Sequence, residues 1–225
     1  MARSRSSARS TSRQPGATKP PKSRQPDLVL ERPSPSRRTR KTILIATEDT
    51  GSGRHYLESI AREVRQWCSI SFAPHRGSNP RSVYKAAKDS ASDGPYNEVW
   101  LIFDTEGPQN TNRMNEARDV IESARQIGFS TAISNPCLEY WFILHFEKCT
   151  DPLVDGEAAS HRLRRQIPGY DKGTDCYPPT RPLLGDARRN AKELYKERCV
   201  QNAGHPCDCH PCTQMFALMD SLFGE

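Results

Sequence analysis

The sequence predicts an α/β domain in which helices cover both faces of a doubly wound, mostly parallel sheet. Short apolar runs typical of buried strands alternate with stretches whose apolar residues recur at helical spacing, over residues 41–148. Parallel neighbours need a crossover connection, which the helical stretches supply. Residues 149–225 hold three more helical stretches joined by Pro- and Gly-rich segments. We expect these to form a helical extension packed against the sheet domain.

Four segments have the β-branched and aromatic composition of strands and are bounded by turn residues. They cover residues 41–47, 69–73, 98–103 and 129–133. Amphipathic spacing predicts helices between and after these strands. The predicted helices cover residues 54–67, 80–91, 112–127, 157–167, 183–200 and 213–223. Pro80 suits the first turn of the second helix, and Gly128 suits the end of the third.

The first forty residues differ in composition from the rest of the chain. Residues 1–41 contain twelve Lys or Arg and two acidic residues, with many Ser and Pro. Because such a segment buries little apolar surface, we expect residues 1–40 to form a disordered basic tail. The remaining residues carry 21 basic and 25 acidic side chains, so the net positive charge belongs to the tail. Two roles remain open: a tether that raises non-specific affinity for nucleic acid, and a solubilising extension.

The composition argues against membrane and secreted proteins. No run of eighteen apolar residues is present, and the Arg- and Ser-rich start lacks the apolar core of a secretory signal, although a transit peptide has a similar composition. Several of the eight cysteines fall in predicted helices beside apolar residues. Without a secretory signal, this indicates reduced thiols in a cytoplasmic protein with no membrane partner.

Acidic residues follow two of the predicted strands where each one ends. Glu48 comes after the first strand, and Asp104 and Glu106 come after the strand that begins at Glu98. The period of two along a strand puts Asp104 and Glu106 on one side of the chain, at the sheet edge where open α/β sheets place their sites. Three converging carboxylates repel one another unless a hard cation such as Mg²⁺ or Mn²⁺ binds them. The alternative is that the acids only begin the next loop.

A Glu after an early strand and an acidic pair after a later one resemble the Toprim arrangement of primases, topoisomerases and a set of nucleases. A wider set of segments is similar to the RloB-like family. These segments are Ile43–Glu48, the loop around Gly77 and Pro80, Glu98–Asp104, Ser134–Phe146 and Tyr170–Gly173. The resemblance covers roughly residues 41–222, and Ser134–Phe146 is its most specific part.

This resemblance implies a Toprim-like fold and a Mg²⁺-dependent (or Mn²⁺-dependent) nuclease that acts on RNA or DNA in bacterial anti-phage defence, including abortive infection. It also implies an ATPase partner encoded nearby. A non-catalytic subunit that senses or docks within an ATPase-containing defence complex is the alternative. Its support is Glu106, because the family usually has Asp there, and a longer side chain alters the metal distance or preference. The first motif departs as well, with Thr47-Glu48-Asp49 where Glu-Gly-Glu is common.

The resemblance also implies roles for single residues. Glu48, Asp104 and Glu106 would be catalytic and metal-binding, and Lys172 would bring a point charge to the scissile phosphate. Asn135 and Gly77 would bind substrate. For Lys172, a solvated loop lysine is the equal alternative.

The Ser134–Phe146 segment combines a turn with a largely apolar helix. Pro136 is expected as the first helical residue, with Ser134 or Asn135 as the cap. Glu139 then falls in the first turn, where it either joins the metal site or complements the helix dipole. His145 fits a hydrogen-bonded core histidine better than a catalyst.

Soft metal ligands crowd the C-terminal segment His205–Cys212. A zinc site needs four ligands, but the Cys-x2-Cys spacing occurs once, at Cys209 and Cys212. The sequence therefore favours free thiols. Zinc at Cys207, Cys209 and Cys212 remains open, and it would need completion by a ligand from this segment or from elsewhere in the chain. The candidates for completion are His205, His210, Cys199 and Cys176.

Overall fold

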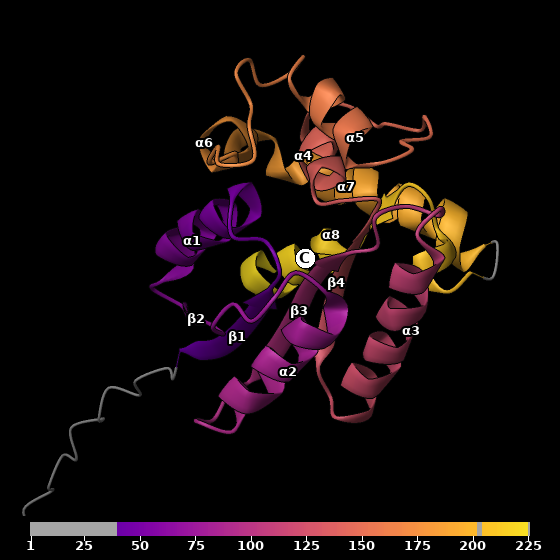
Figure 1. Ribbon diagram of the computed structural model, residues 1–225. Helices are drawn as coiled ribbons and strands as arrows, with labels where there is room; N and C mark the ends of the chain where they lie inside the picture. Colours follow the sequence, from indigo (N-terminus) through magenta and orange to yellow (C-terminus); the bar gives the residue numbers. More distant parts are fainter. Residues whose placement is uncertain (1–39, 202–203, 225) are drawn as a thin grey trace, which may run out of the picture. The chain divides into compact units, whose positions relative to one another are not determined.

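The computed structural model describes residues 40–201 and 204–224, and the remaining text refers to these residues (Figure 1). Apart from Arg40, the tail predicted over residues 1–40 lies outside them. No helix in these ranges is long and apolar enough to cross a membrane.

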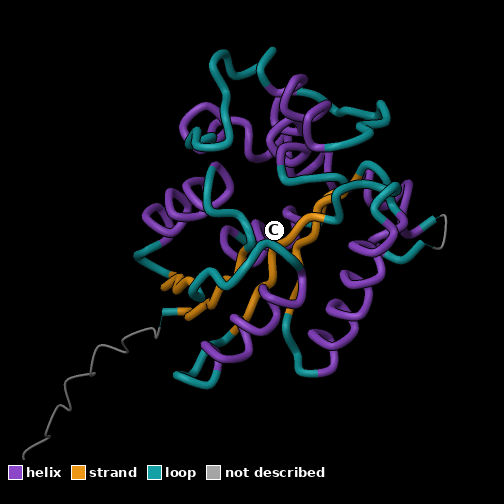
Figure 2. Tube along the Cα trace, viewed as in Figure 1, coloured by secondary structure: helices purple, strands orange, loops and turns teal. Residues whose placement is uncertain are grey.

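A five-stranded sheet forms the centre of the structure, with strand order β2-β1-β3-β4-β5 (Figure 2). The strands are β1 (Lys41–Thr47), β2 (Cys68–Phe72), β3 (Glu98–Asp104), β4 (Ser130–Asn135) and β5 (Cys212–Thr213). The first four run parallel, and β5 pairs antiparallel with the end of β4. The predicted α/β fold with a mostly parallel sheet is confirmed. Strands β1 and β3 are direct neighbours, with Thr47 opposite Ile102, so their carboxyl ends meet at one edge.

Eight α-helices lie in the described ranges. They are α1 (Ser52–Val64), α2 (Pro80–Ala91), α3 (Thr111–Gln126), α4 (Glu139–Phe146), α5 (Gly156–Leu163), α6 (Tyr177–Thr180), α7 (Leu184–Tyr195) and α8 (Met215–Phe223). Short turns of other helix types cover Arg181–Leu183, Lys196–Val200 and Pro206–Asp208. The helix predicted over residues 183–200 is therefore not continuous. It consists of α7 followed by a π-helical turn, and a 3-10 turn precedes it. The sequence pattern did not indicate α6 or β5, because both are too short to show a period.

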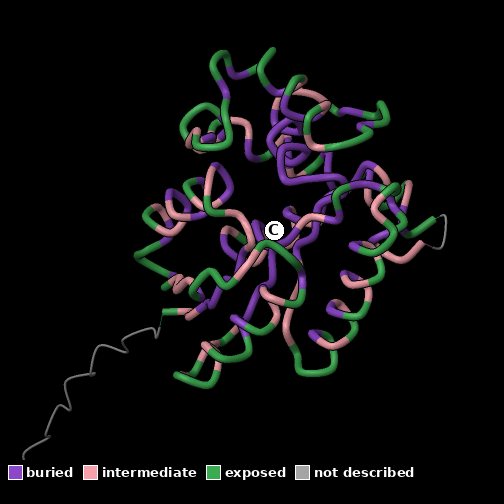
Figure 3. Tube along the Cα trace, in the orientation of Figure 1, coloured by how far each residue is buried: buried purple, intermediate pink, exposed green. Residues whose placement is uncertain are grey.

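The central strands are buried on both faces (Figure 3). Alternate residues of β1 enter two separate cores, as the pleat requires. Ile43 and Ile45 pack with α1, α4, α7 and α8, whereas Leu44 and Ala46 pack with α2 and α3. This explains the continuous apolar runs, which are typical of a parallel sheet covered by helices. Residues after 148 share the first core, because α7 packs against α4 and α8 and β5 extends the sheet.

The start of α4 differs from the expectation. Pro136 is not its first residue, since the helix begins at Glu139 and the Asn135–Pro136 peptide bond is cis. Asn135 cannot cap the helix, because its side chain is bonded to the segment before β5. The later start still leaves Glu139 in the first turn, as predicted.

Candidate active site

A cleft of about 760 Å³ opens at the carboxyl ends of β1 and β3. We call it the carboxylate cleft, because acidic side chains dominate its wall. Its acidic lining residues are Glu48, Asp49, Asp104, Glu106, Glu139, Asp155 and Glu157. Three cationic side chains, Arg113, Arg164 and Lys172, also line it. The cleft thus combines a concentrated negative charge with a few cationic groups.

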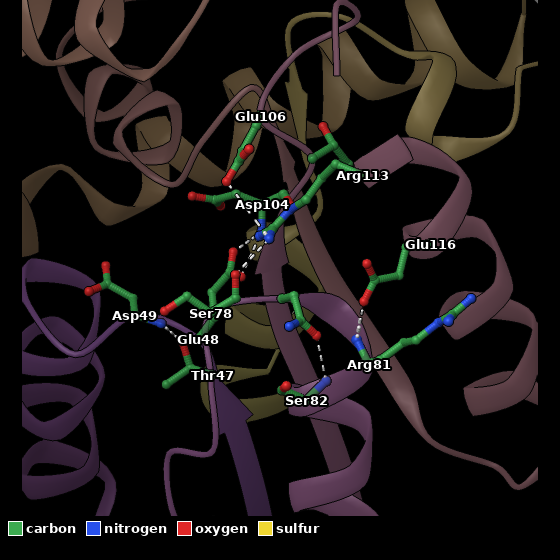
Figure 4. Close-up of polar contacts among 12 residues, drawn as sticks. Thr47, Glu48, Asp49, Ser78, Arg81, Ser82, Asp104, Glu106, Arg113 and Glu116 are labelled. Atoms are coloured by element: carbon green, nitrogen blue, oxygen red, sulfur yellow. Dashed lines mark hydrogen bonds and ion pairs between the residues drawn. The ribbon is translucent and has the colours of Figure 1, made fainter. Parts of the chain in front are cut away.

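Asp104, the last residue of β3, interacts with three other carboxylates of the cleft. Desolvation and the charges of Glu48, Glu139 and Asp49 raise the pKa of Asp104 well above its usual range. The backbone N–H of Leu138, just before α4, donates to this carboxylate. Figure 4 shows the Asp104 side chain turned away from the Arg113 guanidinium, on the side of Asp49. A carboxylate in such surroundings favours binding either a proton or a cation.

Glu48 is fixed by two donors from different segments. The backbone N–H of Asp104 donates to its Oε1 at 2.6 Å, and Arg113 forms an ion pair with its Oε2. Arg113 is only 8% exposed and also donates to the carbonyl oxygens of Asp104 (2.9 Å) and Ser78 (2.7 Å). Burial raises the pKa of Glu48, and the Arg113 charge opposes this rise. Arg113 therefore joins the ends of β1 and β3 to the loop before α2.

Asp49 stands beside Glu48 and holds the turn into α1. Its two carboxylate oxygens accept the backbone N–H groups of Gly51 (2.6 Å) and Gly53 (2.9 Å). Burial is the main cause that raises the pKa of Asp49, and the Glu139 charge adds to it. A Cβ at Gly53 would lie 2.5 Å from the Asp49 carboxylate, so the close approach requires glycine.

Glu139 extends the acidic group from the first turn of α4. It is 8% exposed, and its Oε1 accepts the hydroxyl of Tyr170 at 3.0 Å and, more weakly, that of Ser160 at 3.4 Å. The Tyr170 hydroxyl also lies 3.2 Å from that of Ser52. Burial and the Glu139 charge raise the pKa of Tyr170, which keeps the phenol protonated as a donor. These contacts orient the Glu139 carboxylate within the cleft.

Lys172 reaches the rim because its loop is bonded to the start of α1. The backbone N–H of Ser52 donates to the Lys172 carbonyl oxygen at 2.6 Å. A Cβ at Gly51 would lie 1.9 Å from that oxygen, so only glycine allows this approach. The Lys172 side chain is exposed and lines the cleft, a position open to both expected roles, contact with a substrate phosphate and a solvated loop lysine.

Three other predicted site residues lie differently. Glu106 is 53% exposed, has a positive φ of 61°, and contacts Arg113 at 3.7 Å and the Asn110 side chain at 2.7 Å. It lines the outer part of the cleft and takes no part in the contacts around Asp104 described above. Asn135 is fully buried outside the cleft lining. Gly77, in the loop before α2, is also outside that lining and packs toward Ser82.

The comparison with family models agrees with this arrangement. The model of the RloB-like protein family matches residues 43–222. The chain belongs to the RloB-like family. The match spans the sheet, both layers of helices and every side chain of the carboxylate cleft named above. A comparison with curated proteins found no match. The family membership implied by the sequence is therefore confirmed, while catalytic and metal-binding roles stay predictions.

The donor set of this family member fits a hard divalent cation. Asp104, Asp49 and Glu139 place carboxylate oxygens in one desolvated region, and Glu48 is held next to them. Mg²⁺ and Mn²⁺ prefer such oxygen ligands. Asp104, Glu139, Glu48 and Asp49 line the cleft together, but no three of their carboxylate oxygens lie within 4.8 Å of one another in the described part of the chain, so one ion would draw these side chains closer. Glu106 points instead to the cation of Arg113.

Several side chains that hold the acids of the site in place were not among the site residues predicted from the sequence. Arg113 sits in a predicted helix and gave no signal, because arginines are common on helix surfaces. Tyr170 and Ser160 come from the C-terminal third of the chain, and only the packing of that part on α4 brings them to Glu139. Asp49 was visible as the neighbour of Glu48 at a strand end. His145, expected in the core, is 2% exposed there, and burial lowers its pKa to about 4.

The C-terminal cysteines also differ from the expectation. Cys199 and Cys209 are joined in a disulfide, with their Cα atoms 5.4 Å apart, where free thiols were expected. The other six cysteines are free and buried. The turn after α7 folds back, so residues ten positions apart in sequence meet.

Proposed function

We propose that this chain is a metal-dependent nuclease of the RloB and Toprim type, which cuts RNA or DNA phosphodiester bonds in anti-phage defence. The observation that carries the proposal is the convergence of Glu48, Asp49, Asp104 and Glu139 in one cleft. Structural acids are normally paired with cations or spread over the surface. Here burial and mutual repulsion raise the pKa of Asp104 well above its usual range, and perturbed groups in a cleft are typical of functional sites.

The other residues of the cleft suit a polyanionic substrate. Lys172 and Arg164 lie on the cleft wall, where they attract the phosphate backbone. Arg113 and the Asp104 N–H hold Glu48 in one orientation, so its carboxylate is placed to exchange a proton with a reacting group. Tyr170 keeps the Glu139 carboxylate directed into the site. A Mg²⁺ or Mn²⁺ ion held by Asp104, Glu139 and neighbouring carboxylates would polarise the scissile phosphodiester.

The test is cleavage of total RNA and plasmid DNA with Mg²⁺ or Mn²⁺, alone and with any ATPase encoded beside this chain. Asp104→Asn keeps the shape of the side chain and removes its charge. We expect the variant to lose roughly three orders of magnitude in cleavage rate, because it removes stabilisation of charge in the transition state. Asp171→Asn is the matched control, since Asp171 is exposed and bonds only within its own loop.

The outcomes are distinct. Cleavage lost in Asp104→Asn and kept in Asp171→Asn supports the nuclease and identifies the nucleic acid that it attacks. Equal cleavage by both variants contradicts the assignment.

A second candidate is a sensing or docking subunit without catalysis, within an ATPase-containing complex. The observation in its favour is the position of Glu106, which is exposed and paired with Arg113. Such a subunit would bind divalent cations in the carboxylate cleft, detectable by titration calorimetry, but cleave no nucleic acid with or without its partner.

A further inference from the structure

Three cysteine sulfurs meet near the C-terminal end of the chain, outside the lining of the carboxylate cleft. We call Cys199, Cys209 and Cys212 the thiol cluster. Their Sγ atoms all lie within 4.8 Å of one another, and each residue is at most 3% exposed. Sulfur ligands 2.3 Å from a tetrahedral zinc ion lie roughly 3.8 Å from one another. Two of the sulfurs, of Cys199 and Cys209, are bonded to each other and would separate to this spacing on reduction, and the third lies within 4.8 Å of both.

The thiol cluster is separate from both cores of the sheet. It forms its own group, and Tyr195 is the only partly buried apolar residue packed against it in the described residues. The chain around it has little regular structure, since a single 3-10 turn lies between Gly204 and Cys212. In this segment Cys207 packs into the core on the α2 and α3 side of the sheet, and a cross-link among the other three cysteines would stabilise the rest.

We propose that the thiol cluster of the reduced protein is a structural zinc site. Cys209 and Cys212 supply the Cys-x2-Cys pair that the sequence showed, and Cys199 supplies the third ligand from the π-helical turn after α7. Cys199 is one of the residues that the sequence left open as a further ligand for a zinc site. The site is independent of the nuclease proposal, because its ligands are soft sulfur atoms and lie outside the carboxylate cleft.

The Cys199–Cys209 disulfide is the oxidised form of the same site. A dithiol reductant transfers two electrons and two protons to it, which breaks the S–S bond, yields two thiols and leaves the reductant as a disulfide. Zn²⁺ then replaces the protons of the three thiols, which are released to solvent. The rearrangement is local, because all three sulfurs already lie within 4.8 Å of one another and only the bonded pair has to separate.

Cys207 is our candidate for the fourth ligand. It is fully buried and lies two residues before Cys209, but its Sγ is outside the group of sulfurs within 4.8 Å of one another, so it would have to turn toward the ion. His205 suits the role less well, because its Nδ1 accepts the backbone N–H of Cys207. His210 is also engaged, since its Nδ1 bonds the Asn135 side-chain oxygen and its ring also bonds the backbone of Leu153.

The position of the thiol cluster gives it an architectural role. The Asn135 amide donates to the carbonyl oxygens of Cys207 (3.0 Å) and Cys209 (2.9 Å), so β4 is bonded directly to the cysteine-bearing loop. The next two residues, Pro136 and Cys137, line the carboxylate cleft. A zinc ion would thus fix the position of the cysteine-bearing loop. Because the end of β4 is bonded to this loop, the ion would also stabilise one wall of the cleft.

The test measures metal content of the full chain, produced with added zinc and purified with a phosphine reductant and no chelator. We expect about one zinc ion per chain by elemental analysis. Cys199→Ser and Cys212→Ser should each lose most of it. Cys149→Ser is the matched control, because Cys149 is a free cysteine that is equally buried but outside the thiol cluster. Cys207→Ser should also lose zinc, and retention there would overturn the choice of fourth ligand.

A second measurement covers variants that fail to fold. Wild-type protein is titrated with a mercurial that blocks thiols, and released zinc is followed with a chromogenic chelator. Release in step with the blocking of three or four thiols, as a zinc site of this kind requires, supports the proposal. Absence of zinc from the reduced wild type, or zinc that survives both Cys199→Ser and Cys212→Ser, overturns it.

Discussion

The carboxylate cleft and the thiol cluster are both reached from the end of β4, but they are built in different ways. The cleft collects carboxylates, among them four from residues 48 to 139, at the ends of strands and at the start of a helix, and it is open to solvent. The thiol cluster collects sulfur ligands from residues 199 to 212, and all three are buried. Hard ligands around an open site suit exchangeable Mg²⁺ and a substrate, whereas soft ligands in a closed site suit permanent zinc.

The two regions also differ in their expected effect on the stability of the fold. Four carboxylates in one desolvated region repel one another, and only Arg113 pairs closely with one of them among the contacts described above. In the thiol cluster, Cys199 and Cys209 form an uncharged disulfide, and burial raises the pKa of the Cys212 thiol, which keeps it uncharged at neutral pH. The cleft is thus expected to reduce stability for the sake of function, and the thiol cluster to increase it. The following predictions test that contrast, from the largest expected effect to the smallest.

Arg113→Met should cause the largest loss, about 3–5 kcal/mol in the free energy of unfolding, because it leaves Glu48 buried without its cation. Urea unfolding followed by circular dichroism measures this. Arg81→Met is the control, since Arg81 is 70% exposed and its ion pair with Asp119 is on the surface. A loss below about 1 kcal/mol for Arg113→Met would show that the acids of the cleft do not need this cation.

Asn135→Ala should cost about 2–3 kcal/mol, because two buried carbonyl oxygens, of Cys207 and Cys209, lose their donor. This variant removes the side-chain part of the connection between the two regions and leaves the backbone pairing of Asn135 with Cys212 in place. Asn97→Ala, at an exposed position with bonds to Thr42, is the control. If both variants unfold at the same urea concentration, the two regions are not braced against each other through Asn135.

His145 tests the pH dependence of the fold separately from that of the cleft. Helix α4 carries Glu139, which lines the cleft, at one end and His145, which lies in the core, at the other. Burial lowers the pKa of His145 to about 4, so the folded state binds a proton less readily than the unfolded chain, whose histidine pKa is about 6.5. Its stabilising contribution is complete above pH 6.5 and is lost as the pH falls toward 4.

From pH 7 to pH 5, this residue should remove about 2 kcal/mol of stability. Between pH 7 and pH 5, the free energy of unfolding of His145→Phe should therefore fall by about 2 kcal/mol less than that of the wild type. Urea unfolding at each pH measures this. The same pH dependence in both proteins would mean that His145 is protonated without cost in the folded state.

Asp104→Asn should give the smallest change and the opposite sign. Without divalent cations we expect a small gain, because the amide cannot ionise and so escapes the desolvation and repulsion that raise the pKa of Asp104. Mg²⁺ should raise the melting temperature of the wild type and not that of the variant, since ligand binding stabilises only a protein with the site. A destabilised Asp104→Asn that still responds to Mg²⁺ would place the cation elsewhere.

Local patterns were enough to predict the alternation of strands and helices. The apolar runs of β1 and β3 and the helical spacing of α2 and α3 are properties of short segments, so they are visible without the fold. The rule that sites form at the carboxyl edge of parallel strands then placed Glu48 and Asp104 together, and the register of β1 with β3 brings them into contact. The RloB-like family was apparent from motifs in the same segments and is confirmed by the family match.

Tertiary structure decided what depends on contacts between distant segments. Tyr170 reaches Glu139, and Arg113 reaches Glu48, only because separate helices pack at one edge. Glu106 follows the period of two from Asp104, but the strand ends at Asp104 and the positive φ of Glu106 turns its side chain toward Arg113. Cys199 meets Cys209 and Cys212 through a turn that no spacing rule predicts. The sequence thus determined the elements and the family, whereas packing, which sets distances between remote side chains, determined which groups share a site.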